Sequence, residues 1–276
     1  MLVAGNLHRT APGQAADAYT KGSGMSQLEG KKILITGSTR GIGFGMAEKM
    51  AALGASLILT GRDQTAADAA AAELASATGA KVASLGAPLT DEDAVNGLVD
   101  RAAAIFGGID VLVNNAGIDS DGPALDHALE DWRRVIHVNL EVPFRLAQQA
   151  ARHFLSEGKG GVVINVASVA GFKAIDEASS YVASKHGLVG LTKVLALEWG
   201  RKNIRVCGIA PGLIKTDMTQ YIWGNEAGQA YVNNKIPIGR IGLPSDIGAL
   251  TAFLASEDAG FIHGETIIVD GGATID

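Results

Sequence analysis

Tyr181 and Lys185 are four residues apart in the segment SSYVASK, which spans residues 179–185. On a helix, this spacing places both side chains on one face. A free tyrosine has a pKa near ~10 and is a poor base at neutral pH, but a nearby ammonium group favours the phenolate. The pair therefore indicates a phenol that exchanges a proton with a substrate oxygen. Without supporting residues elsewhere, an incidental pair on a helix surface is the simpler interpretation.

Gly37, Gly41 and Gly43 lie between an apolar stretch and a helical pattern in KILITGSTRGIGFGMAEKM. Residues without a Cβ allow a sharp turn, and they let backbone N–H groups approach a pyrophosphate at a helix N-terminus. The spacing is G-x-x-x-G-x-G. A tight turn that binds nothing is the alternative, but the strand before the glycines and the helix after them favour a dinucleotide-binding loop.

Seven short apolar stretches are the predicted strands, at residues 32–36, 56–60, 81–85, 110–114, 161–167, 204–210 and 266–270. Most lack alternation of polar and apolar residues, which is typical of strands buried on both faces of a parallel sheet. Helical patterns separate the strands. They include 64–78, a helix through Leu98 that Thr90 and Asp93 begin as a capping box, and a helix that begins at Pro244. We predict a single α/β domain of the Rossmann type: a doubly wound, seven-stranded parallel sheet with helices on both faces.

Composition restricts the class of function. The chain has 276 residues, of which 47% are hydrophobic and 19% charged, and these values are typical of a globular protein. The net charge of -6 argues against nucleic-acid binding, which depends on neutralising phosphates. No apolar run approaches the ~18 residues that a membrane span requires. The single cysteine, Cys207, excludes an internal disulfide and a cysteine-built metal site, so we predict no metal and a cytoplasmic location.

The first residues differ from the rest. Residues 1–24 lack the apolar centre of a secretory signal, and the KGSG that precedes Met25 resembles a flexible joint. We predict that 1–24 are a poorly ordered leader without a role in the chemistry. Residues 25–276 then form the single domain.

Several motifs, taken together, resemble the short-chain dehydrogenase/reductase family. They are TGSTRGIG, NNAG at 114–117, Ser168 at the family spacing before Tyr181, the Y-x-x-x-K pair, and PG at 211–212. The motifs occur in the family order, and the resemblance extends from about residue 28 to 273. It implies the doubly wound fold, a nicotinamide cofactor at the C-terminal edge of the strands, and interconversion of a ketone and a secondary alcohol.

The resemblance assigns four catalytic residues: Asn139, Ser168, Tyr181 and Lys185. Tyr181 would exchange the proton, and Lys185 would favour the phenolate and bind the hydroxyl groups of the nicotinamide ribose. Ser168 would donate a hydrogen bond to the substrate oxygen. Asn139, in HVNLEVPF, would shape a helix kink whose main-chain carbonyl holds a water behind Lys185.

The resemblance also implies a set of cofactor contacts, most of them in loops that follow strands. They are Gly37, Ser38, Thr39, Arg40, Gly41, Ile42, Gly43, Arg62, Leu89, Asn115, Ala116, Gly117, Tyr181, Lys185, Pro211, Gly212, Ile214 and Thr216. Asn114 is expected to stabilise the central sheet instead. Pro88 occupies the place where relatives usually have an Asp that binds adenine, so adenine recognition is left to the backbone of Leu89.

The cofactor preference follows from the end of the second strand. Gly61 lies where family members that prefer NAD usually carry Asp, and Arg62 follows it. Arg40 lies in the glycine loop, and two guanidinium groups would bind a 2′-phosphate strongly. Asp63 would partly neutralise Arg62, and arginines that merely face solvent are the alternative. We predict NADP(H) in preference to NAD(H).

Residues 213–240 are predicted to form the substrate lid, with an apolar wall over the nicotinamide made by Met218, Tyr221, Ile222 and Trp223. The substrate is expected to be a small-molecule carbonyl or alcohol. General resemblance favours a 3-oxoacyl thioester, and sugar, polyol or steroid-type alcohols are the alternative. A dinucleotide-sensing protein without turnover is a further alternative, but the complete catalytic set argues for an enzyme.

The resemblance implies two kinds of protein partner. Family members are mostly tetramers or dimers joined through helices that correspond here to about 127–155 and 180–200, with a second contact near the C-terminal strand, so we expect a homo-oligomer, with a homotetramer favoured. The second is acyl carrier protein, which the resemblance would dock on Lys159 and Lys202 near the mouth of the active site. A solvated surface charge is the simpler interpretation of each lysine.

Overall fold

The computed structural model describes residues 27–223 and 225–275, and the predicted leader lies outside them. The strands are β1 (Lys32–Ile35), β2 (Ser56–Gly61), β3 (Val82–Gly86), β4 (Val111–Asn114), β5 (Gly161–Val166), β6 (Ile204–Pro211) and β7 (Thr266–Val269). They form one seven-stranded sheet in the order β3-β2-β1-β4-β5-β6-β7, and every pairing is parallel. The predicted doubly wound single domain is confirmed.

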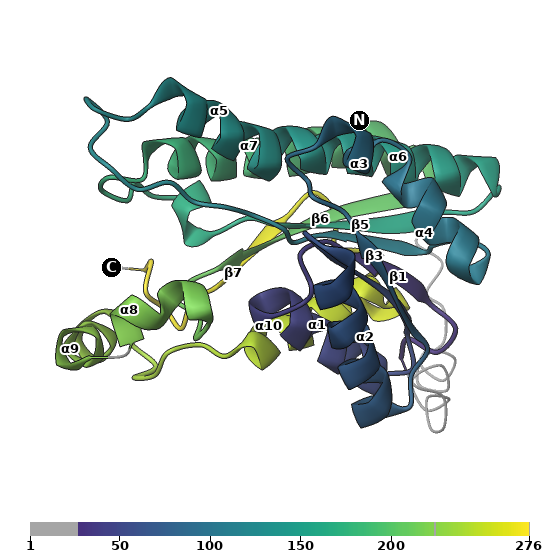
Figure 1. Ribbon diagram of the computed structural model, residues 1–276, viewed down its shortest axis with the longest axis horizontal. Coiled ribbons are helices and arrows are strands. Elements are labelled where there is room, and N and C mark those ends of the chain that lie inside the picture. Colours follow the sequence, from purple (N-terminus) through teal and green to yellow (C-terminus); the bar gives the residue numbers. More distant parts are fainter. Residues whose placement is uncertain (1–26, 224, 276) are drawn as a thin grey trace, which may run out of the picture.

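Helices cover both faces of the sheet (Figure 1). On one face lie α1 (Gly41–Ala52), α2 (Gln64–Thr78) and α10 (Pro244–Ala255). On the other lie α3 (Glu92–Val95), α4 (Leu98–Phe106), α5 (Leu129–Ile136), α6 (Val142–Ser156) and α7 (Ser179–Trp199). A π-helical turn, His137–Glu141, joins α5 to α6, and the short 3₁₀ turns are Val169–Gly171, Gly200–Lys202, Asp217–Thr219 and Glu257–Ala259.

The strands lack a polar face because both of their faces are buried. Successive side chains of a strand point to opposite sides of the sheet. Ile33 and Ile35 of β1 lie in the core with α1, α2 and α10, whereas Leu34 lies in the core with α4, α6 and α7. All three side chains are 0% exposed. The continuous apolar runs in the sequence therefore correspond to a sheet between two helical layers.

The helix predicted through Leu98 is interrupted, and the predicted capping box is wrong. Asp91, rather than Thr90, caps α3, because its carboxylate accepts a hydrogen bond from the Asp93 backbone N–H at 2.9 Å. Gly97 then adopts a left-handed φ of 65°, which a right-handed helix cannot continue through, and α4 begins anew. Pro244 is the first residue of α10, as predicted.

The segment after β6 forms a separate lobe. It contains α8 (Gln220–Trp223) and α9 (Glu226–Lys235), which project past one end of the sheet in Figure 1. This lobe is the segment predicted to be the substrate lid. No helix within the described ranges has the length and apolar character that crossing a bilayer requires.

Candidate active site

The C-terminal ends of β1 and β4 lie side by side where the chain switches direction across the sheet, the place where doubly wound folds bind ligands. The Thr36 hydroxyl oxygen accepts hydrogen bonds from the backbone N–H groups of Asn115 and Ala116, each at 3.0 Å. In return, Asn115 Nδ2 donates to the carbonyls of Thr36 and Gly37 at 2.9 and 2.8 Å. These bonds join the glycine loop and the NNAG segment into one wall.

The glycines let the loop pack closely against neighbouring backbone and leave its N–H groups accessible to a ligand. Gly37 and Gly41 have left-handed φ values of 60° and 58°. A Cβ at Gly37 would lie 2.9 Å from Ala116 Cα, and one at Gly43 would collide with the Gly37 carbonyl. No side chain caps α1, so the backbone N–H groups at its N-terminus remain available to an anion. The loop therefore fits a pyrophosphate.

Ser38 and Thr39, both predicted cofactor contacts, have different surroundings. Ser38 is 0% exposed; its hydroxyl donates to the Ile35 carbonyl at 2.8 Å and accepts from the Thr60 N–H at 3.1 Å. Its side chain thus ties β1 to β2 and does not project from the loop. A Cβ at Gly61 would lie 2.6 Å from the Thr39 methyl group. Thr39 therefore occupies the space that an aspartate side chain at position 61 would need.

The two arginines predicted to bind a 2′-phosphate are both exposed. Asp63 caps α2 by accepting from the Ala66 N–H at 2.8 Å, so its carboxylate is engaged away from Arg62. Within the described residues Arg62 forms no ion pair. Arg40 pairs with Asp217 at the base of the lid, with 3.3 Å between Nη1 and Oδ2. Arg62 is thus available to a phosphate, whereas Arg40 must release the Asp217 carboxylate before it can bind one.

Tyr181 and Lys185 lie in the first two turns of α7, and the Lys185 ammonium nitrogen is 5.5 Å from the centre of the Tyr181 ring. Lys185 is only 4% exposed, and its Nζ donates to the Val166 carbonyl at the end of β5 at 2.9 Å. Burial lowers the pKa of Lys185 to about 8, although the negative charge of Asp119 acts in the opposite direction. The ammonium is therefore still mostly charged at neutral pH.

Ser168 follows β5 and faces Tyr181. Its hydroxyl oxygen accepts from the Ala170 N–H at 3.1 Å, which fixes the side chain at the start of a 3₁₀ turn. Burial raises the pKa of Tyr181 to about 12; the side-chain hydrogen bond with Ser168 lowers this pKa, and the charge of Asp119 raises it. Tyr181 therefore carries its proton at neutral pH, and the site can donate two hydrogen bonds toward one substrate oxygen.

Asn139 lies in the π-helical turn and is fully buried. Its Oδ1 accepts from the Ile118 N–H at 2.9 Å, and its Nδ2 donates to the Ile118 carbonyl at 2.8 Å and to the Ser184 hydroxyl at 3.1 Å. The irregular helix expected at Asn139 is present as this π-turn, a feature that often marks functional sites. Asn139 thus fastens the NNAG segment to α7 beside Lys185.

The loop after β6 closes the wall from the lid side. Pro211 ends β6, and Ile214, 3% exposed, forms an isolated bridge with Gly242. A Cβ on Gly41 would come within 3.5 Å of the Thr216 methyl group, so the base of the lid lies against the glycine loop.

Two further predictions concern Asn114, expected to stabilise the sheet, and Leu89, expected to contact adenine. Asn114 Nδ2 donates to Asn165 Oδ1 across β4 and β5 at 3.0 Å, the sheet-stabilising position expected for it. Leu89 is buried just after β3, and Pro88 beside it is half-buried. Binding of adenine at Leu89 stays a prediction.

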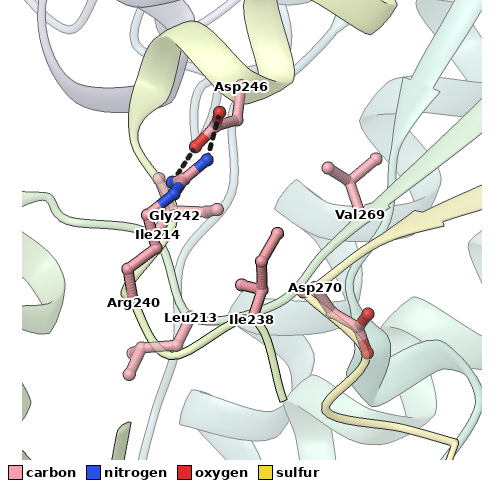
Figure 2. A pocket seen from close by; sticks show the side chains of 9 residues that line it. Leu213, Ile214, Ile238, Arg240, Gly242, Asp246, Val269 and Asp270 are labelled. Atoms are coloured by element: carbon pink, nitrogen blue, oxygen red, sulfur yellow. Dashed lines mark hydrogen bonds and ion pairs between the residues drawn. The ribbon is translucent and has the colours of Figure 1, made fainter. Parts of the chain in front are cut away.

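A cavity of about 230 Å³ adjoins this loop, between the segments that follow β6 and β7 (Figure 2). The Arg240 guanidinium points at Asp246 and binds both of its carboxylate oxygens, at 2.7 and 3.0 Å. Of the predicted cofactor residues, its described lining includes only Ile214. The cavity is thus a neighbour of the catalytic side chains and does not contain them.

The expectation that Lys159 and Lys202 lie near the mouth of the active site is wrong within one chain. Lys159 and Lys202 precede β5 and β6, so they lie at the N-terminal edge of the parallel sheet. Ser168 follows β5, and it faces Tyr181 at the C-terminal edge. The two lysines therefore do not flank the mouth of the same chain's active site. No group of three or more metal-binding side chains occurs among residues 27–223 and 225–275.

Sequence reasoning missed three residues that shape the site: Thr36, Asp119 and Ser184. Thr36 is a polar residue at the end of an otherwise apolar strand, which was a usable signal because buried hydroxyl groups need partners. Asp119 was visible as an acid just after NNAG. The role of Ser184 depends on the π-turn, and no local pattern in the sequence indicates that turn.

The comparisons agree with this geometry. A family model described as enoyl-(acyl carrier protein) reductase matches residues 37–274. The chain is 40% identical to a 2-dehydro-3-deoxy-D-gluconate 5-dehydrogenase of Escherichia coli K12 over 89% of its length and 96% of the relative's. It is also 40% identical to the 3-oxoacyl-[acyl-carrier-protein] reductase FabG of Aquifex aeolicus, over 89% of this chain and 98% of that one.

A solved structure gives the same result. The crystal structure of an Agrobacterium tumefaciens protein described as a 2-deoxy-D-gluconate 3-dehydrogenase, with bound NADP, is 36% identical and superposes with a TM-score of 0.83. The match covers 90% of this chain and 98% of that one. Together with the motifs and the sheet order, these similarities show that the chain belongs to the short-chain dehydrogenase/reductase family of oxidoreductases, which act on CH–OH groups.

Proposed function

We propose that the chain is an NADP(H)-dependent enzyme that interconverts a ketone and a secondary alcohol, with Tyr181 as the proton donor and acceptor. The observation that carries the proposal is the meeting of Tyr181, Lys185 and Ser168 at one edge of the sheet, beside the glycine loop. A half-buried phenol, a buried ammonium and a fixed hydroxyl have no evident structural reason to be grouped there.

The residues present fit a phosphorylated dinucleotide. The uncapped N-terminus of α1 suits the pyrophosphate, and Arg62 suits a 2′-phosphate because its neighbour Asp63 is engaged as a helix cap. Thr39 excludes the acid at position 61 that would favour NAD. The NADP in the Agrobacterium relative supports the same choice. When bound, the cofactor supplies or accepts the hydride.

Side chains of the protein transfer the proton and stabilise the charge on the substrate oxygen. During reduction, Tyr181 gives its proton to the substrate oxygen, and Ser168 donates a hydrogen bond to that oxygen as negative charge develops. A pKa of about 12 keeps Tyr181 protonated before the reaction. During oxidation, Tyr181 takes the alcohol proton, and the charge of Lys185 favours the phenolate that this step requires.

Lys185 and Asn139 position the proton donor. Lys185 is fixed by Val166 on one side, and the backbone around Ile118 is fixed by Asn139 on the other. A water held by the main chain of Asn139 would then connect Lys185 to solvent, and this part of the proposal follows from the family resemblance. Residues 213–240 would close over the substrate as a lid.

A 3-oxoacyl thioester is the first candidate substrate, supported by the FabG relative. Keto sugars and polyols are the second, supported by a 38% identical D-threitol dehydrogenase of Mycolicibacterium smegmatis and by the acid Asp119 near Tyr181. Acyl carrier protein has weak support as a partner, because Lys159 and Lys202 lie at the far edge of the sheet. We also propose a cytoplasmic enzyme, in keeping with the single buried cysteine.

We propose that the chain forms a homo-oligomer, a tetramer or a dimer, through the outer face of α6 and α7. Phe144, Val194 and Leu197 are 40%, 43% and 84% exposed on these helices. Large apolar side chains exposed on adjoining helices are typical of an interaction surface.

The function is tested by following absorbance at 340 nm with NADPH or NADH and a panel of carbonyls. The panel contains acetoacetyl thioesters, diketones and keto sugars. We expect oxidation of NADPH with at least one member and a lower kcat/KM with NADH. Tight NADPH binding without turnover of any member would contradict the enzyme and favour a dinucleotide sensor.

The cofactor part has its own test. Replacing Arg40 and Arg62 together by Ala should lower kcat/KM for NADPH at least ~10-fold and leave NADH within about twofold, because only NADPH carries the phosphate. An unchanged preference would show that these arginines do not bind the phosphate. The Arg101→Ala variant is a matched control, because Arg101 lies on α4 and its guanidinium bonds the carbonyls of Ala94 and Asn96.

A further inference from the structure

We propose that Asp119 determines the substrate class: its carboxylate accepts a hydroxyl of a neutral polyhydroxylated substrate and repels substrates that carry a carboxylate. This inference rests on the proposed function and deepens it. It names a residue outside the assigned catalytic and cofactor sets, and it separates neutral polyols and keto sugars from sugar acids.

The backbone before Asp119 is fixed behind the proton donor. Both backbone groups of Ile118 are bound by the Asn139 amide, at 2.9 and 2.8 Å. A Cβ at Gly117 would lie 3.5 Å from Lys185 Nζ, so the chain passes directly beside the ammonium. The position of Asp119 is therefore fixed, because it directly follows the anchored Ile118 and lies two residues after Gly117, which contacts Lys185.

The backbone after Asp119 is fixed to the entrance of α7. The Gly122 N–H donates to the Glu177 carbonyl at 2.8 Å, and α7 begins two residues later at Ser179. The segment from Ile118 to Gly122 thus runs from the back of the site to the first turn of α7, which carries Tyr181. A side chain on this segment borders the space where a substrate must approach the phenol.

The Asp119 carboxylate is open to a ligand. Its Oδ1 accepts from the Ser120 N–H at 2.8 Å, and the side chain is exposed. Within the described part of the chain it forms no ion pair. One carboxylate oxygen is therefore left for a substrate hydroxyl, and no ion pair among the described residues holds it.

The charge of Asp119 acts on the reacting groups. It raises the pKa of Tyr181 and that of Lys185. In turn, loss of solvent and the charge of Asp121 raise the pKa of Asp119, while Lys185 and His127 lower it. A charge that influences the phenol also influences a substrate bound to the phenol, because unlike and like charges interact strongly at short range in a partly dry site.

Asp119 would select substrates by an attractive hydrogen bond to a hydroxyl and by electrostatic repulsion of a carboxylate. A neutral polyol offers Asp119 a hydroxyl donor, whereas the carboxylate of a sugar acid meets a like charge. Asparagine in the same place keeps an acceptor oxygen and removes the charge. The Asp119→Asn variant therefore isolates the repulsive term with little change in shape.

The experiment compares paired alcohols that differ only in one end group, CH₂OH or COO⁻: D-threitol with D-threonate, and D-glucitol with D-gluconate. The initial rates of NADP⁺ reduction give kcat/KM for each. The wild-type chain should prefer the neutral member of at least one pair, and Asp119→Asn should lower that preference about tenfold. Asp126→Asn, which removes the same charge from an exposed position further along the loop, should leave the ratio within twofold.

A second readout separates electrostatics from a structural defect. Loss of the Asp119 charge lowers the pKa of Tyr181, so the rise of the oxidation rate with pH should move to lower pH in Asp119→Asn and not in Asp126→Asn. Lys185, Asp121 and His127 are the other charged or titratable groups that act on Asp119, and they are unchanged in both variants.

Three results would overturn the inference: a wild-type preference for the acids, a ratio that Asp119→Asn leaves unchanged, or no oxidation of any of the four alcohols. If the last result occurs while a carbonyl of the wider panel is reduced, the proposed function stands and only the assignment of Asp119 is lost. If no carbonyl is reduced either, both are lost.

Discussion

Lys185 is a charged side chain in a place where charge is unfavourable. It is 4% exposed, and burial lowers its pKa from 10.5 to about 8. Holding the ammonium in the charged form at neutral pH therefore costs roughly 3 kcal/mol of folding stability. Such a cost is reasonable at an active site, where the same charge favours the phenolate of Tyr181. Function and stability act against each other at this residue.

We predict that Lys185→Met abolishes turnover and increases the free energy of unfolding by about 1–3 kcal/mol near pH 7. Because the pKa of Lys185 is lower in the folded chain than in the unfolded one, the unfolded chain binds more protons between these values. Wild-type stability should therefore rise relative to the variant as pH increases, and the difference should shrink by about 2 kcal/mol between about pH 7 and pH 9.5. Urea unfolding followed by circular dichroism measures both quantities.

Lys193→Met is the matched control, because Lys193 lies on the same helix and is exposed. Its effect on stability should be small, because its ammonium already lies in solvent. A difference between wild type and Lys185→Met that does not change with pH would show that the ammonium is not desolvated.

At the scale of elements, the site depends on how the ends of β1 and β4 are joined. Thr36 is 1% exposed, and its hydroxyl is the acceptor for two backbone N–H groups, those of Asn115 and Ala116. Without the hydroxyl, the half-buried Ala116 N–H would lose this acceptor, and the Asn115 N–H would keep only the Val113 carbonyl, at 3.1 Å. The wall that would carry the cofactor therefore depends on a side chain that is not expected to touch it.

We predict that Thr36→Val lowers the free energy of unfolding by about 1–3 kcal/mol, because the Ala116 N–H loses its acceptor and an unsatisfied donor costs about 1–3 kcal/mol. NADPH affinity should fall as well, since the glycine loop loses its support. Thr36→Ser restores the hydroxyl and should recover most of both losses. Chemical unfolding and fluorescence titration with NADPH measure them, and equal behaviour of the Val and Ser variants would contradict this role.

The sequence predicts elements well where burial is the dominant signal. Each of the seven strands appeared as a short apolar run, because both faces of the sheet are covered by helices. The helix predicted through Leu98 was interrupted because Asp91 and Gly97 set local boundaries that the apolar period does not reveal. At these two residues, helix capping and backbone conformation set the helix ends, although the apolar spacing would allow one continuous helix.

The site was predictable only in part for a similar reason. The family motifs indicated that Ser168, Tyr181 and Lys185 belong together, and the structure brings them to one edge of the sheet. The pairing of Arg40 with Asp217 was not predictable, because the two residues are far apart in sequence. The placement of Lys159 and Lys202 is wrong because it followed the family resemblance, although both lysines precede predicted strands, 161–167 and 204–210, and so lie at their N-terminal ends.

At the scale of the molecule, α5, α6 and α7 form the outer layer on one face of the sheet (Figure 1). These helices carry exposed apolar side chains, among them Leu129, Phe144 and Leu197. We predict that the wild-type chain forms dimers or tetramers of its 28.3 kDa subunit and that Leu197→Glu yields smaller species. A buried, unpaired carboxylate at this face would oppose association. Size-exclusion chromatography with light scattering measures the mass.

Ile105→Glu is the control for that experiment, because Ile105 is partly exposed on α4, outside the proposed face. It should leave the mass unchanged. A wild-type chain that is monomeric at micromolar concentration would contradict the proposed interface, and so would an unchanged mass of the Leu197→Glu variant.

The central claim is that the Tyr181 hydroxyl carries the proton of the reaction, and the most direct test is the kcat of Tyr181→Phe with NADPH and the best carbonyl of the panel. The account predicts a loss of roughly 10²–10⁴-fold, the usual contribution of a positioned acid, with the NADPH dissociation constant within about twofold of wild type. A variant that binds NADPH normally and retains more than about one-tenth of the wild-type kcat would contradict it, because a phenyl ring has no proton to give.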